Sequence, residues 1–166
     1  MQKMIKFLSL FVVLFASMTV SAEEKYAVID VRAALFASKA AQSFSEQLKK
    51  DFSGDEEEIK KVGSEAQKLQ DRMKKDGAMM SEAERGKISE EFEGKAKEFN
   101  FLKNKFEAAV NKRKQAFLMD SKPKVDQAIL KVAKSNKLTM LFPKEATLWV
   151  EPKLDLTSQV IEELNK

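Results

Sequence analysis

Few kinds of side chain in this sequence could do acid–base or nucleophilic chemistry, because the chain contains neither cysteine nor histidine. It therefore offers no thiol, disulfide, imidazole base or Cys/His metal site. Carboxylate pairs such as Glu90 with Glu91 lie in a charged helical stretch, where no pocket would raise a pKa. A serine without histidine, or a lysine on an exposed helix, is not an activated nucleophile. We predict a protein that is not an enzyme and has no catalytic residue, metal or cofactor.

The remaining side chains suit binding. Met73, Met79 and Met80 cluster in the sequence, and methionine is flexible and polarizable enough to contact varied apolar partners. Alternatively, Met73 closes an apolar seam between helices, and the other two close a turn. Phe101 lies beside Leu102 but off that seam. It therefore either contacts a partner or packs on a neighbouring pair of helices from another copy of the chain.

Basic side chains form two short clusters, Lys74-Lys75 and Lys112-Arg113-Lys114. Both could attract anionic lipid headgroups or acidic segments. Because Asp and Glu are interleaved along most of this region, they could equally be solvated helix faces. The whole chain has 30 Lys/Arg against 26 Asp/Glu, a formal charge of +4. So small a surplus is weak support for a nucleic-acid binder, and we predict no nucleic acid partner.

Residues 1–22 have the three parts of a secretory signal peptide. Two lysines form a positive start, residues 7–20 form an apolar stretch too short to span a bilayer comfortably, and small residues end at a cleavage site after Ala22. The mature chain would begin at Glu23 with a net charge of +2. We expect a secreted protein, for which the absence of cysteine is compatible with an oxidising compartment.

The segment that positions the candidate residues is highly charged. Residues 45–120 carry 17 basic and 17 acidic side chains and no proline, too few apolar groups for a globular core. From Ile59 to Met73 the apolar residues recur at alternating steps of three and four, the heptad pattern of a coiled coil. The pattern resumes after residues 76–81, where an Asp-Gly turn precedes a Ser-x-x-Glu capping box.

This arrangement predicts an antiparallel helical hairpin over residues 45–119, with its apex near residues 76–81. Facing apolar residues would have numbers with a nearly constant sum, as Phe52 and Phe106 do. Four glycines interrupt the arms, and each costs about 1 kcal/mol relative to alanine in a helix interior. Either the arms bend and fray there, or these glycines are merely tolerated on exposed faces.

The flanks, residues 23–44 and 120–166, are richer in apolar residues and should form a separate body. We predict three strands and a final amphipathic helix capped by Asp155-Leu-Thr157, with a kink of the returning arm at Pro123. The predicted strands span residues 25–30, 138–142 and 147–150. The residues assigned to this oligomerisation body are Tyr26, Val28, Leu141, Leu148 and Trp149, of which Tyr26 and Trp149 belong either to its core or to a subunit interface.

A sheet this small has exposed edges and is marginally stable alone, and oligomerisation would answer both problems. The sequence therefore predicts an α+β, mainly α fold, in which a long antiparallel helical hairpin projects from a small β body that assembles with other copies.

In the order of its motifs, the chain resembles the Skp (OmpH) family of periplasmic chaperones. The motifs are Lys25-Tyr-Ala-Val-Ile-Asp-Val31, Ser81-Glu-Ala-Glu-Arg85, Leu138-Thr-Met-Leu-Phe142, Leu148-Trp-Val150 and Asp155-Leu-Thr157. They surround a charged hairpin behind a signal peptide, and the resemblance covers residues 23–166.

The resemblance implies a homotrimer whose hairpins enclose a cavity that holds unfolded outer-membrane β-barrel proteins, without ATP, in the periplasm. Met73, Met79, Met80 and Phe101 would then be client-binding residues. Some family members contact lipopolysaccharide through basic side chains, so the two basic clusters become candidates for anionic contacts, although the resemblance assigns no residue to that role.

The alternative function is a secreted structural or adaptor coiled coil that binds a folded envelope partner. A spacer of that kind should have a continuous apolar seam and few glycines, whereas this sequence has glycines in both arms. The broken pattern favours a flexible clamp.

Overall fold

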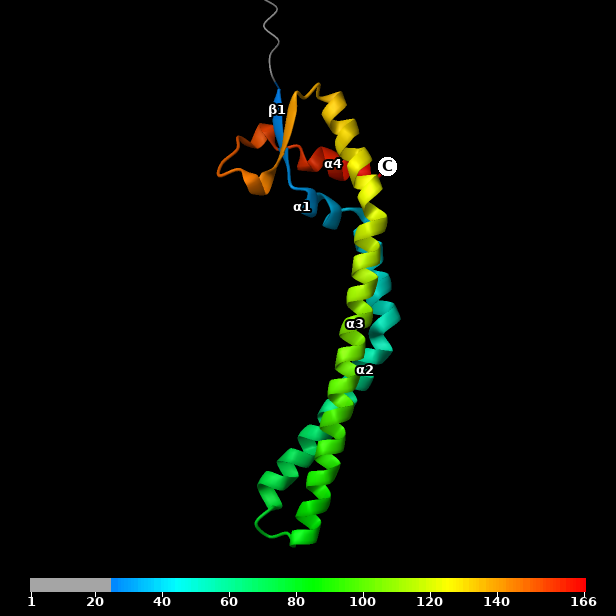
Figure 1. The fold of residues 1–166 in the computed structure, drawn as a ribbon, viewed down its shortest axis with the longest axis vertical. Coiled ribbons are helices and arrows are strands. Elements are labelled where there is room, and N and C mark those ends of the chain that lie inside the picture. The colour runs from blue at the N-terminus through cyan, green and yellow to red at the C-terminus, as the bar shows by residue number, and fades with distance from the viewer. Residues whose placement is uncertain (1–24) are drawn as a thin grey trace, which may run out of the picture.

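The computed structural model describes residues 25–166, so the predicted signal peptide lies outside the described residues. A small body carries a long helical hairpin (Figure 1). In chain order the elements are β1 (Tyr26–Ile29), α1 (Val31–Phe36), α2 (Lys39–Asp76), α3 (Glu82–Ser135), β2 (Met140–Pro143), the 3-10 helices η1 (Lys144–Ala146) and η2 (Pro152–Leu154), and α4 (Thr157–Leu164). The predicted α+β, mainly α fold with its projecting hairpin is confirmed.

Strand β1 is the centre of the body. Strand β2 pairs with it in parallel, with Val28 opposite Phe142. Val28 also forms a bridge with Asp155, and its carbonyl accepts a hydrogen bond of 2.9 Å from the Leu156 amide. The apolar core that packs here comprises Ala27, Ile29, Ala34, Ala128, Val132, Leu156 and Val160. Leu156 immediately precedes the final helix and Val160 lies within it, and both are buried in this core.

The prediction of a third strand at residues 147–150 is wrong. That segment is irregular and connects η1 to η2. β1 already has β2 on one edge and the Asp155 segment on the other, so within one chain it has no free edge to offer. The second strand is also shifted, to Met140–Pro143.

Side-chain caps fix where α1, α2 and α3 begin. Asp30 accepts a hydrogen bond from the Ala33 amide at the start of α1, and Ser38 accepts one from the Ala41 amide at the start of α2. Ser38 is buried, and its hydroxyl also donates to the Leu35 carbonyl at 2.6 Å, which ties the corner between these two helices. The predicted capping box of Ser81 and Glu84 opens α3. The predicted cap of the final helix differs, because its N-cap is Leu156, which has no capping side chain, and Asp155 one residue earlier accepts a hydrogen bond of 3.0 Å from the Thr157 amide.

Helix α3 runs from the arm into the body without a break. It continues through Pro123, and its last turns bury Val125, Ala128 and Val132 against the body. One continuous helix therefore links the two parts of the molecule. No helix within residues 25–166 is long and apolar enough to cross a membrane.

The two arms lie side by side as an antiparallel pair (Figure 1). The predicted partners Phe52 and Phe106 meet edge to face, with ring centroids 5.7 Å apart. Along α2 only Ala41 and Val62 are buried, and along the arm part of α3 only Ile88 is. The seam therefore excludes water at few points.

The four arm glycines differ in their surroundings. A Cβ at Gly54, Gly86 or Gly94 would meet nothing within 4 Å, so these three glycines lie on open faces. This agrees with the interpretation that they are tolerated on exposed faces. A Cβ at Gly63 would lie 3.1 Å from the ring of Phe99. Gly63 is therefore part of the seam, where its lack of a side chain lets a facing phenylalanine approach the backbone.

Candidate functional site

The hairpin apex presents one methionine to solvent. Met79 is 84% exposed, while Met73 and Met80 are half-buried. Helix α2 ends with a hydrogen bond of 3.1 Å from the Gly77 amide to the Met73 carbonyl, and the turn follows with one of 2.9 Å from the Met79 amide to the Asp76 carbonyl. A Cβ on Gly77 would lie 2.3 Å from the Met73 carbonyl oxygen. The three predicted methionines are thus brought together at one end of the molecule, with Met79 the most available for contact.

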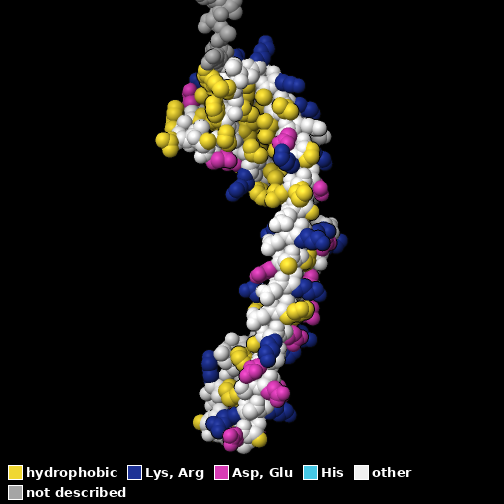
Figure 2. Space-filling view, in the orientation of Figure 1, with side chains coloured by type: hydrophobic (Ala, Val, Ile, Leu, Met, Phe, Trp, Pro, Cys, Tyr) yellow, Lys and Arg dark blue, Asp and Glu magenta, His cyan; other side chains and the backbone are white. Residues whose placement is uncertain are grey.

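Phe101 lies far from that apex, on the arm. Its side chain is 67% exposed, whereas Leu102 and Phe106 are half-buried in the seam. It is therefore an isolated apolar group on the arm surface. Figure 2 shows scattered apolar side chains between Lys/Arg and Asp/Glu along the arm, and within residues 45–117 the large exposed ones are Met79 and Phe101.

The two basic clusters are placed differently. Lys74 and Lys75 occupy the last turn of α2, where cations interact favourably with the helix dipole. In the second cluster, Arg113 binds Asp51 across the seam at 2.9 Å, so it holds the two arms together. Lys112 and Lys114 are exposed and form no ion pair among residues 25–166.

An apolar groove opens at the base of the arm, where α1, α2 and α3 meet. The rings of Phe44 and Phe117 stack there with centroids 4.3 Å apart. Phe36 from α1 is 58% exposed and Leu118 from α3 is 44% exposed, and both line the groove. Neither Phe36 nor the groove could be predicted from the sequence. Phe36 reaches the arm because the chain turns at Ser38 between α1 and α2, and the sequence pattern does not show the direction of that turn.

A second apolar surface lies on the body, in the loop between η1 and η2. Leu148 is fully exposed and Trp149 is 79% exposed, so neither belongs to the core of a single chain. Val28 is buried, and Leu141 packs against the core. Tyr26 is more than a third exposed at the start of β1. Of the two predicted places for Trp149, the core is excluded.

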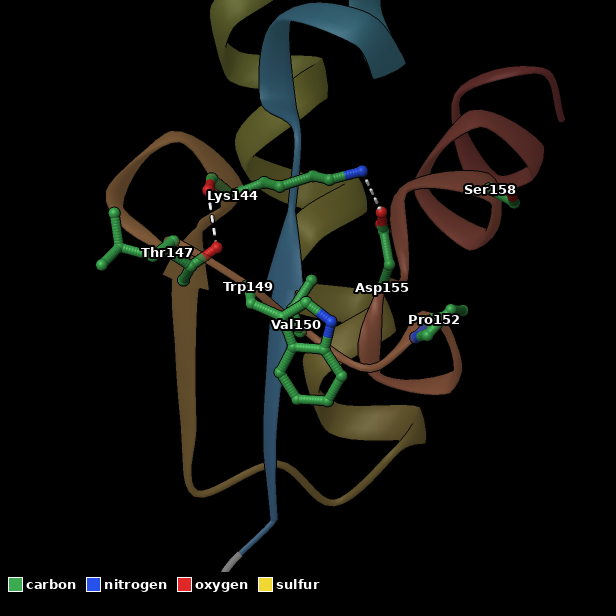
Figure 3. A pocket seen from close by; sticks show the side chains of 8 residues that line it. Lys144, Thr147, Trp149, Val150, Pro152, Asp155 and Ser158 are labelled. Atoms are coloured by element: carbon green, nitrogen blue, oxygen red, sulfur yellow. Dashed lines mark hydrogen bonds and ion pairs between the residues drawn. The ribbon is translucent and has the colours of Figure 1, made fainter.

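Beside that loop, Lys144 binds Asp155 at 2.7 Å (Figure 3). Partial burial alone would raise the pKa of Asp155, but hydrogen bonds from Lys144 and from the hydroxyl and amide of Thr157 outweigh it and lower the pKa to about 2. The Thr157 hydroxyl in turn accepts a hydrogen bond of 2.9 Å from the Asp30 amide. This polar cluster fastens the loop and the start of α4 to the end of β1.

Among residues 25–166 there is no group of acidic side chains placed to hold a metal ion. The surfaces that stand out are apolar and exposed, and a surface of that kind binds macromolecules.

Comparison with known proteins agrees with this architecture. The family described as "Outer membrane protein (OmpH-like)" matches residues 25–164. The chain belongs to the OmpH-like family. The match covers both the body and the arm, so the family assignment does not rest on the coiled coil alone.

Two relatives extend the OmpH-like assignment. The chain is 30% identical over 166 residues to a Skp-like protein of Pseudomonas aeruginosa, covering 100% of this chain and 99% of the relative. It is 23% identical over 152 residues to the chaperone protein Skp of Pectobacterium atrosepticum, covering 92% of each.

The fold is shared with a solved OmpH-like structure. The crystal structure of a putative outer membrane chaperone from Caulobacter crescentus superposes with a TM-score of 0.60 at 15% identity, covering 86% of this chain and 84% of that one. At that identity the likeness concerns the fold. The Asp155-Leu-Thr157 motif that suggested the OmpH-like family is the polar cluster that fastens the body together.

Proposed function

We propose that this OmpH-like protein is a chaperone that holds unfolded outer-membrane β-barrel proteins between flexible helical arms and prevents their aggregation without ATP. The observation that carries the proposal is the exposure of apolar groups along an arm with a sparsely buried seam, from Met79 at the apex to the groove at the base. Relatives named Skp-like protein and chaperone protein Skp support it.

An unfolded barrel strand has alternating apolar side chains and unpaired backbone groups, and it aggregates when exposed. A chaperone that binds such chains gains from many weak contacts, because several contacts within one complex together give high avidity. We propose Met73, Met79, Met80 and Phe101 as contacts of this kind. Lys74, Lys75, Lys112 and Lys114 are proposed to contact anionic groups on a client or on lipopolysaccharide, while Arg113 is engaged within the arm.

We also propose that the protein is a homotrimer assembled through its body. Leu148 and Trp149 are large apolar side chains that one chain leaves uncovered, and a neighbouring subunit would bury them. The body would comprise residues 23–44 and 120–166, and residues 45–119 would form the arm. With residues 1–22 as a cleaved signal peptide, the place of action would be the periplasm.

The experiment is a dilution assay. An outer-membrane protein unfolded in urea is diluted into buffer with and without a molar excess of the mature chain, and light scattering is followed. We expect the chain to suppress scattering in the absence of nucleotide. Unchanged scattering would contradict the proposal and favour a structural or adaptor coiled coil.

A further inference from the structure

The groove at the base of the arm is built by three helices. Its volume is about 290 Å³, and its lining residues are Phe36, Ala41, Phe44, Ser45, Leu48, Lys114, Phe117 and Leu118. The α2 residues recur at steps of three, one and three, and the α3 residues at steps of three and one, so each helix turns one continuous face toward the groove. The stacked rings of Phe44 and Phe117 are half-buried and contribute its most enclosed part.

The groove has space for an apolar side chain. Phe36 and Leu118 keep about half of their surface exposed, and the volume between them exceeds that of one large side chain. The corner at Ser38 holds Phe36 in place, since the buried Ser38 hydroxyl bonds both to the Leu35 carbonyl and to the Ala41 amide. The groove is therefore held open by the fold and does not have to be formed by the ligand.

The only charged side chain in the lining is a free cation. Lys114 lies one turn of α3 before Phe117 and Leu118, and no carboxylate among residues 25–166 pairs with it. Its neighbour Arg113 binds Asp51, so that aspartate is already engaged. An apolar groove with one unpaired cation is complementary to an apolar group that lies beside an anion.

We propose that this groove binds an aromatic or aliphatic side chain of an unfolded client protein whose neighbouring residue carries a carboxylate. The inference rests on the proposed function, and it adds a sequence preference to it. Apolar contact with Phe36 and Leu118 gives affinity, and Lys114 selects acidic over basic flanking residues. Because one contact of this type is weak, the preference ranks segments of a client and does not decide whether a client is held.

Two labelled peptides test the preference. In both, phenylalanine alternates with polar residues, and the polar residue after each phenylalanine is aspartate in one peptide and lysine in the other. The mature chain, Lys114→Glu and Lys105→Glu are titrated with each peptide by fluorescence anisotropy at low salt. Lys105→Glu is the matched control, since it makes the same change of charge at an exposed position of α3 that does not line the groove. Phe36→Ser tests the apolar contact, with circular dichroism to confirm that the variant is folded.

We expect the chain to prefer the aspartate peptide and Lys114→Glu to weaken its binding up to about fivefold, the upper end for an exposed charge pair. Lys105→Glu should change binding much less, and Phe36→Ser should weaken both peptides. Equal effects of the two lysine substitutions, or no effect of Phe36→Ser, would overturn the inference. A photo-reactive residue at position 36 should cross-link to the peptide. Cross-links to another copy of the chain would overturn the inference, because they would show that the groove is covered by a second subunit.

These outcomes are separable from those of the aggregation assay. If the chain suppresses aggregation but Lys114→Glu and Lys105→Glu bind the peptides equally, the groove inference fails and the holding function stands. If the chain binds the aspartate peptide through Lys114 but suppresses no aggregation, the holding function fails.

Discussion

The body and the arm of this molecule are stabilised in different ways. The body has a small continuous core, in which Ile29 and Val160 are almost completely buried, and a polar cluster around Asp155 that joins three segments. The arm consists of two long helices, and its described seam buries Val62 and Ile88 at isolated points. A firmly held body and a compliant arm suit a protein that assembles through one part and adapts to varied partners with the other.

Truncating a buried side chain should show this difference most strongly. Ile29→Ala opens a cavity in the body core and should lower the free energy of unfolding by about 3 kcal/mol, whereas the same truncation in the arm seam, Ile88→Ala, should lower it by about 2 kcal/mol or less. Urea unfolding followed by circular dichroism, at one fixed protein concentration, measures both. Equal losses would mean that the arm is packed as tightly as the body.

Acid should weaken the body through Asp155. Its pKa is lowered from 3.8 to about 2, so its ionised form stabilises the fold fully above pH 4, and this contribution is lost as the pH falls through 2. The contribution is at most about 2 kcal/mol, because a pKa difference of one unit corresponds to about 1.4 kcal/mol and the ion pair is partly exposed.

Stability against urea, measured between pH 5 and pH 2, therefore tests the cluster. Asp155→Asn should be less stable than the parent chain at pH 5, and the difference should shrink toward pH 2. A difference that stays constant over this range would show that the carboxylate does not stabilise the body through its charge. Glu151→Gln, whose carboxylate pairs only with exposed Lys153, is the matched control.

Glycine substitutions in the arm should give the smallest effects and reveal where it can be stiffened. Gly54→Ala meets no neighbour and should stabilise the helix by up to about 1 kcal/mol. Gly63→Ala should bring little or no gain, because its Cβ would press on the Phe99 ring. Thermal unfolding compares the two variants. An equal gain in stability for Gly63→Ala and Gly54→Ala would show that the Phe99 ring can move away from the new Cβ with no loss of stability.

Much of this architecture could be predicted from the sequence, because local patterns encode it. Heptad spacing gave the hairpin and the Phe52–Phe106 contact, the Ser81–Glu84 box gave the start of α3, and Asp155-Leu-Thr157 gave the final helix. The predicted strand at residues 147–150 failed because strand pairing is decided by distant partners, and Leu148 and Trp149 instead lie exposed in a loop.

The candidate site was harder to predict for a related reason. The methionines at the apex are adjacent in sequence, so their clustering was visible. The groove joins Phe36 to Phe44 and Leu118, and this depends on the corner at Ser38 and on the register of the two arms. A spacing of three and four residues does not fix that register to within a turn. The close approach of Phe99 to Gly63 likewise depends on the register and on a residue with no apolar side chain, which the spacing does not mark.

The central claim is that the body assembles while the arm holds. Replacing residues 52–106 by a short glycine-containing turn removes most of the arm and leaves the body intact. The decisive measurement is light scattering of a urea-diluted outer-membrane protein with the shortened chain, in a preparation that sedimentation has shown to be trimeric. We predict no suppression of aggregation by the shortened trimer, whereas the mature chain suppresses it. Suppression as strong as that by the mature chain would contradict the account.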